Sequence, residues 1–136
     1  MLATMILALA LQGAQAARPE EPDCRDPQAQ LEMNVCAGID FEHADAELNR
    51  VYREEVAAAR QADRELDRSA DQRPGYEAVL REAQRAWVAF RDAHCRYEGY
   101  QEARGGSMEP MIYSGCLARL TRERIAQLQP PPEGAH

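Results

Sequence analysis

The sequence lacks the patterns that mark several large fold classes. Its 136 residues include no segment of alternating apolar and polar residues, no internal repeat and no low-complexity tract. Alternation is typical of half-buried strands, and a fixed period is typical of solenoids and propellers. Their absence argues against a β-rich or repeat architecture, and the length predicts one domain.

Groups that catalyse reactions are also scarce. The sequence contains no GxSxG, P-loop, HExxH or GxGxxG motif, so common hydrolase, nucleotide and zinc-protease signatures are missing. Its histidines are His43, His94 and His136. A solvated helix position is expected for His43, and a structural hydrogen bond to the facing helix for His94. The acidic residues alternate with arginine, as solvated helix faces do, and form no positioned glycosidase pair. We predict no enzyme, metal site or cofactor.

Lysine is absent, so all 16 basic residues are arginines; they stand against 23 acidic residues, for a net charge of −7. An acidic surface disfavours nucleic acid and anionic membranes. It favours a cationic protein partner through long-range steering. The oligomeric state does not follow from the charge.

The first residues are apolar in the manner of an export signal. Residues 2–11 form a small apolar run interrupted only by Thr4, and Ala14-Gln15-Ala16 follows. The run is too short to span a bilayer, and A-x-A is typical of cleavage sites. We predict a signal peptide over residues 1–16, a domain over residues 17–129 and a Pro-rich disordered tail over residues 130–136. The alternative is a buried or frayed helix. Without a cysteine after the signal, the expected product is soluble, without stable membrane insertion, and periplasmic or secreted.

The segment 80–95, LREAQRAWVAFRDAHC, has the clearest helical period. Its apolar residues fall on one face that continues to Tyr97 and consists of Leu80, Ala83, Trp87, Phe90 and His94. We predict that this face, with Trp87 and Phe90, forms the core. Gln84 and Arg91 lie at its edge, where polar contacts to a neighbouring helix are expected.

Three further helical segments surround this one. A short helix is expected from Asp26-Pro27 to a break at Gly38. A long helix should follow from Phe41, with Tyr52 on its apolar face, and end in the polar stretch 63–75. The central helix spans about 76–100, and the last begins near Pro110. The predicted fold class is all-α: a small antiparallel helical bundle of three main helices plus a short N-terminal helix, stapled by two disulfides.

The cysteines can be paired by geometry. In two antiparallel helices that turn near Gly105, Cys95 faces Cys116, which leaves Cys24 and Cys36 as a local pair. Four cysteines allow three connectivities, and this sequential one is favoured. A zinc site is the alternative, but the CxxC spacing is absent.

Two polar residues of the long helix are expected to face the central helix. Numbering the hairpin about its turn near residue 71 places Asp45 opposite His94 and Tyr97, and Asn49 within reach of Arg91. We interpret them as inter-helix hydrogen bonds that fix the register.

Three segments together carry a family resemblance. They are CRDPQAQLEMNVCAGIDFEHADAELNRVY (24–52), LREAQRAWVAFRDAHC (80–95) and GGSMEPMIYSGCLARLTRERIAQL (105–128). This combination resembles the lysozyme inhibitor LprI-type domain of bacterial exported proteins. The resemblance implies a helical, disulfide-bonded domain and, for the name-giving member, inhibition of lysozyme. We predict from it an exported inhibitor that binds a lysozyme-type cell-wall glycosidase and occludes its active-site cleft. A non-inhibitory module of the cell envelope, which binds another exported protein or wall material, is the alternative.

The loop before the last helix is the candidate inhibitory element. It consists of Arg104, Gly105, Gly106, Ser107, Met108 and Glu109. Its glycines would expose backbone N–H groups, and Ser107 and Arg104 would add donors for the catalytic carboxylates of a lysozyme. An ordinary helix connection, with Ser107 as cap of the last helix, is an equally good interpretation.

Overall fold

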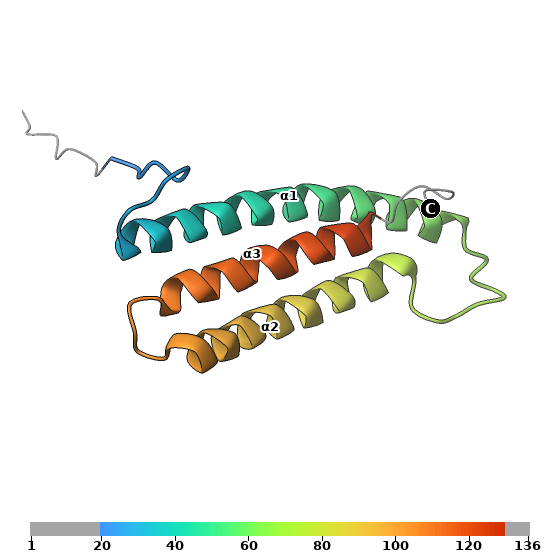
Figure 1. Cartoon of the computed structure of the whole chain (residues 1–136). Helices are drawn as coiled ribbons and strands as arrows, with labels where there is room; N and C mark the ends of the chain where they lie inside the picture. Colours follow the sequence, from blue (N-terminus) through green and yellow to red (C-terminus); the bar gives the residue numbers. More distant parts are fainter. Residues whose placement is uncertain (1–19, 130–136) are drawn as a thin grey trace, which may run out of the picture.

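The computed structural model describes residues 20–129 and folds them into a three-helix bundle. Helix α1 spans Gln30–Glu65, α2 spans Tyr76–Ala103 and α3 spans Glu109–Leu128. In Figure 1 the short α3 lies between the two longer helices, and it runs parallel to α1 and antiparallel to α2. No strand occurs in the described range, so the predicted all-α, disulfide-stapled bundle is confirmed.

The short N-terminal helix is not a separate element. Helix α1 runs without interruption through Gly38. A Cβ atom added at this glycine would lie in open space. A glycine costs a helix interior about 1 kcal/mol, which the packing of a 36-residue helix outweighs. The helix also begins later than Asp26: the Glu32 carboxylate accepts hydrogen bonds from the N–H groups of Gln28 and Ala29, at 2.7 and 3.1 Å.

Helix α2 is capped by a residue of α1. Its N-cap is Gly75, which has no side chain to offer. The Asp63 carboxylate instead accepts hydrogen bonds from the N–H groups of Tyr76 and Glu77, at 2.6 and 3.1 Å. A Cβ atom on Gly75 would lie 2.6 Å from this carboxylate. The helix start therefore requires both the aspartate and the glycine.

The hydrophobic core lies along α3, because α3 packs between α1 and α2. Helix α1 contributes Ala44, Leu48, Val51 and Val56, α2 contributes Cys95, and α3 contributes Cys116, Leu117, Ala118 and Leu120. Trp87 packs against this cluster while half-buried. The predicted core residue Tyr52 is also half-buried.

Part of the face of α2 that was predicted to form the core faces solvent, although Trp87 on that face packs against the core. Phe90 is 57% exposed and Tyr97 is 59% exposed, whereas Arg91 is buried together with Cys95 and Gly99. The prediction for Phe90 is therefore wrong. The Cys95–Cys116 disulfide holds α2 against α3, so Cys95 and the residues one turn before and after it, Arg91 and Gly99, lie on the inward face. The position of the disulfide, and not the most apolar stripe, therefore determines which side of α2 faces α3.

Both predicted disulfides are present. Cys24 bonds Cys36, and Cys95 bonds Cys116. The first ties the leading segment to α1, and the second ties α2 to α3. Within residues 20–129, no helix is both long and apolar enough to cross a membrane. The predicted signal peptide (1–16) and tail (130–136) lie outside the described residues.

Candidate functional site

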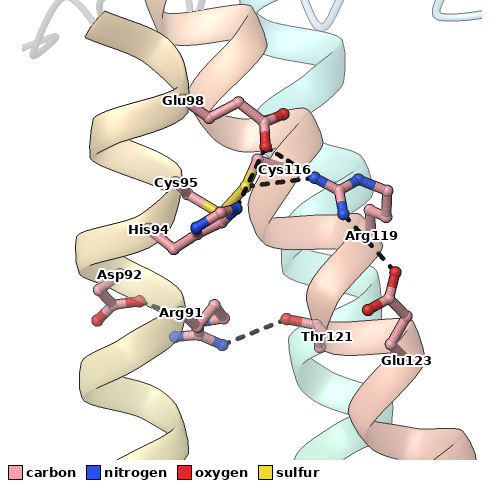
Figure 2. Close-up of a disulfide and its surroundings, with 9 residues drawn as sticks. All are labelled: Arg91, Asp92, His94, Cys95, Glu98, Cys116, Arg119, Thr121 and Glu123. Atoms are coloured by element: carbon pink, nitrogen blue, oxygen red, sulfur yellow. Dashed lines mark hydrogen bonds and ion pairs between the residues drawn. A yellow bond between two sulfur atoms is a disulfide. The ribbon is translucent and has the colours of Figure 1, made fainter. Parts of the chain in front are cut away.

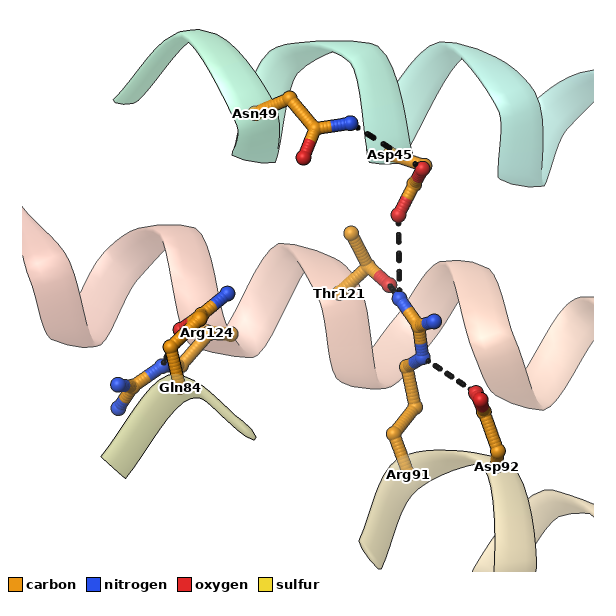
Figure 3. Close-up of polar contacts among 7 residues, drawn as sticks. All are labelled: Asp45, Asn49, Gln84, Arg91, Asp92, Thr121 and Arg124. Carbon is orange, nitrogen blue, oxygen red and sulfur yellow. Dashed lines mark hydrogen bonds and ion pairs between the residues drawn. The ribbon is translucent and has the colours of Figure 1, made fainter. Parts of the chain in front are cut away.

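A buried arginine joins the three helices. The Arg91 guanidinium of α2 donates hydrogen bonds to Asp45 of α1 at 3.1 Å, Thr121 of α3 at 3.3 Å and Asp92 at 2.9 Å (Figure 3). It also lies over the rings of Phe41 and Trp87, with its central carbon 5.2 and 5.1 Å from their centroids. All of its contacts are internal, so Arg91 acts as a structural group.

The other predicted inter-helix residues have different partners from those expected. Asp45 accepts its inter-helix hydrogen bond from Arg91 and not from His94 or Tyr97, whose side chains are exposed to solvent. Asn49 donates to Asp45 at 3.3 Å on its own helix and does not reach Arg91. Gln84 does contact a neighbouring helix, since it accepts a hydrogen bond from Arg124 of α3 at 3.0 Å (Figure 3).

A second polar cluster lies beside the Cys95–Cys116 disulfide (Figure 2). The Glu98 carboxylate accepts from Arg119 at 2.8 Å and lies 3.6 Å from His94 Nε2. Possible ligand atoms of His94, Glu98 and Cys116 lie within 4.8 Å of one another. The Cys116 sulfur, however, is held in the disulfide and is no thiolate, the form that binds metals. The cluster therefore lacks one of the three ligands that its geometry suggests.

His94 does not adopt the expected core position. Its side chain is 39% exposed, and its ring stacks on that of Phe90 with centroids 5.3 Å apart. Its ion-pair partner is Glu98 on its own helix, and within residues 20–129 it forms no hydrogen bond to the facing helix. The prediction of a buried structural histidine is therefore wrong.

In the loop between α2 and α3, the backbone N–H groups of both glycines form hydrogen bonds with nearby residues. The Gly105 N–H donates to the Glu109 carboxylate at 2.6 Å, and the Gly106 N–H donates to the Ala103 carbonyl at 2.7 Å. Gly105 has a φ of +75°, a conformation that favours glycine. The two glycine N–H groups are thus not free donors, contrary to the prediction.

The loop is held from several sides. Asn34 of α1 donates a hydrogen bond to the Ser107 carbonyl at 3.0 Å. No local sequence pattern predicts this contact, although Asn34 lies in the first segment of the family resemblance. The Cys95–Cys116 disulfide joins the flanking helices. Ser107 does not cap α3: the N-cap is Met108, without a side-chain hydrogen bond, and Pro110 lies in the first turn, as predicted.

Two donors of the loop remain available. Within residues 20–129 the Ser107 hydroxyl has no hydrogen-bond partner and the Arg104 guanidinium has no carboxylate partner; the latter lies 4.7 Å over the Tyr100 ring. Ser107 and Met108 are both exposed, Met108 at 46%. The loop thus presents a positive charge, a hydroxyl group and an apolar side chain on a fixed backbone.

The chain is similar to known proteins over nearly all of its described residues. Residues 24–128 match the family model described as "Lysozyme inhibitor LprI". The chain is also 50% identical over 119 residues to an uncharacterized protein, R02472, of Rhizobium meliloti (strain 1021), an alignment that covers 88% of this chain and 85% of the other. No solved structure matches the chain significantly.

Proposed function

The chain belongs to the lysozyme inhibitor LprI family, and on that premise we propose that it inhibits a lysozyme-type glycosidase by inserting the loop 104–109 into the active-site cleft. The family description supports the inhibitory role. The loop residues are our own assignment, which rests on their position and chemistry.

The proposed mechanism is occlusion by complementary donors. Glycosidases of this type carry two carboxylates that flank the scissile bond. The Arg104 guanidinium would pair with one carboxylate, and the Ser107 hydroxyl would donate to the other. Charge-assisted hydrogen bonds of this kind are stronger than neutral ones. Met108 would fill apolar space beside them.

The observation that carries the proposal is that the loop is already ordered while neither donor has a hydrogen-bond or carboxylate partner among residues 20–129. The Gly105–Glu109 and Asn34–Ser107 hydrogen bonds fix its backbone. Binding therefore costs little loop entropy, which is a large part of the cost in flexible segments. The net charge of −7 adds long-range attraction for a cationic enzyme, so association should slow as salt is raised.

Substitutions at the two free donors test the loop. We expect Arg104→Glu to weaken inhibition at least about tenfold, since a repelled carboxylate costs more than 1.4 kcal/mol, and Ser107→Trp to block insertion sterically. Ser107 suits a bulky residue better than Gly106, where a Cβ would lie 3.1 Å from the Ala103 carbonyl. The matched control is Arg85→Glu, an exposed arginine in the middle of α2.

The measurement is inhibition of several lysozyme types by purified protein at low ionic strength. If Arg104→Glu and Ser107→Trp both inhibit as well as the wild type, the loop is not the inhibitory element. If the wild type inhibits no lysozyme, the alternative applies: a non-inhibitory module that binds another exported protein or wall material in the cell envelope. Two disulfides support export to an oxidising compartment in either case.

A further inference from the structure

The solvent face of α2 carries an apolar stripe that the bundle does not use. Its members recur at alternating spacings of three and four residues and are all exposed: Tyr76, Val79, Ala83, Ala86, Phe90, Ala93, Tyr97 and Tyr100. Five of them are large and are 42–59% exposed. We call this set the outer stripe. It lies opposite the inward face that Arg91, Cys95 and Gly99 form.

The spacing of the outer stripe is that of a coiled-coil seam. Apolar residues at the a and d positions of a heptad, 3.5 residues apart on average, face a partner helix. The stripe fills both positions from Tyr76 to Tyr100, with Tyr76, Ala83, Phe90 and Tyr97 at a. A contiguous exposed apolar surface of this extent marks an interaction site.

We propose that the outer stripe is a homodimer interface, in which α2 packs antiparallel against α2 of a second copy, with the two-fold axis near residue 88. This register pairs every stripe position with another: Tyr76 with Tyr100 of the second copy, Val79 with Tyr97, Ala83 with Ala93 and Ala86 with Phe90. Small residues thus meet each other or a single ring.

Charge complementarity favours a second copy of this chain as the partner and an antiparallel orientation of the two α2 helices. Glu82 and Arg96 flank the stripe at the g positions, are exposed, and have no ion-pair partner among the described residues. Antiparallel coiled coils bring g positions of the two chains together, so Glu82 faces Arg96 of the second copy, twice by symmetry. A parallel pair would place Glu82 and Arg96 next to the uncharged Trp87 and Gln101 and gain no such contact.

The available surface suits a dimer. Aromatic side chains bury about 150–250 Å² each, and the four aromatics of the stripe are about half exposed. Together with Val79, the alanines and the aliphatic parts of the flanking side chains, their exposed area approaches the ~800 Å² per partner of a standard interface. At the end of the stripe, Tyr76 and Val79 also line a cavity of about 620 Å³ with Leu66, Pro74 and Leu80. In the antiparallel register, Tyr97 and Tyr100 of the second copy would enter it.

Charge reversal tests the interface without touching the core. We expect the wild type to dimerise reversibly in sedimentation equilibrium. Glu82→Arg and Arg96→Glu should each raise the dissociation constant about tenfold at low salt, because each change makes two contacts repulsive. The double variant Glu82→Arg/Arg96→Glu should return to within about threefold of the wild type. The matched control is Glu42→Arg, an exposed site on α1.

A second variant addresses the apolar seam. Phe90→Asp should abolish the dimer and leave the circular dichroism spectrum unchanged, since Phe90 is 57% exposed in the single chain. Rescue by the double charge swap supports the antiparallel register. A wild type that stays monomeric at all concentrations overturns the proposal, as does a dimer that neither charge reversal weakens. Binding of this face to a different protein, without self-association, overturns it too.

Discussion

Replacing Arg91 with methionine tests whether the bundle depends on its buried charge. The change keeps an unbranched stem and removes the guanidinium, which donates to Asp45, Asp92 and Thr121. The side chains of Asp45 and Asp92 are 37% and 41% exposed, so water can replace the lost donor there. Thr121 is 0% exposed, so its hydroxyl would lose its partner in a dry site.

The magnitude follows from these differences in burial. A buried hydroxyl without a partner costs about 1–3 kcal/mol, and charged hydrogen bonds contribute about 1.5–3 kcal/mol each before water replaces them. The two cation–π contacts add roughly 0.5–1 kcal/mol each, and packing of the thioether offsets part of the loss. We expect Arg91→Met to lower the free energy of unfolding by about 2–4 kcal/mol, out of the roughly 5–15 kcal/mol typical of a domain.

Urea unfolding followed by circular dichroism measures this free energy, and Thr121→Val completes a double-mutant cycle. Alone, Thr121→Val should cost about 1 kcal/mol, but in the Arg91→Met background it should be neutral or stabilising, because it removes the unsatisfied hydroxyl. Buried ion pairs are sometimes replaced by apolar residues without loss. An Arg91→Met protein as stable as the wild type would therefore refute the reasoning.

Three further changes test the helix faces, the cap and the acid response. Trp87→Ala should cost about 2–4 kcal/mol and Phe90→Ala less than about 1 kcal/mol in the monomer, by urea unfolding; equal costs would contradict the observed orientation of α2. Asp63→Ala should cost about 1–2 kcal/mol through loss of the α2 cap, and Asp63→Asn less, since the amide oxygen still accepts; a negligible loss for Ala would contradict the cap. The ion pair with Arg122 lowers the pKa of Asp40 below its usual value of 3.8, so the stability it adds is complete above that pH and is lost as the pH falls through the lowered folded-state pKa. Asp40→Asn should therefore flatten the acid limb of a stability profile, and an unchanged limb would argue against this contribution.

The covalent and topological parts of the fold could be predicted from the sequence. A turn near Gly105 places Cys95 opposite Cys116, and the structure has this pairing. The features that the sequence did not predict depend on a balance between opposing free energies. Gly38 did not break α1, because a break would give up more packing than a helical glycine costs. The helical period of α2 favoured its most apolar face as the core, but the Cys95–Cys116 disulfide holds a different side of the helix against α3.

The candidate loop shows the same limit at the level of single atoms. The sequence indicated where the chain turns and which donors it carries. It did not indicate that the Glu109 carboxylate folds back on the Gly105 N–H, or that Asn34, distant in the sequence, holds the Ser107 carbonyl. Such contacts depend on the positions of three helices at once, which no local pattern contains.

The order of the disulfides bears on how the protein matures. Each cysteine is bonded to its nearest neighbour in the sequence, with separations of 12 and 21 residues, and the two closed loops do not overlap. A chain that enters an oxidising space N-terminus first would present Cys24 and Cys36 before the second pair emerges, so simple oxidation in order of arrival yields the native bonds. The protein should therefore need an oxidant for its biogenesis, but no isomerase to correct mispaired cysteines.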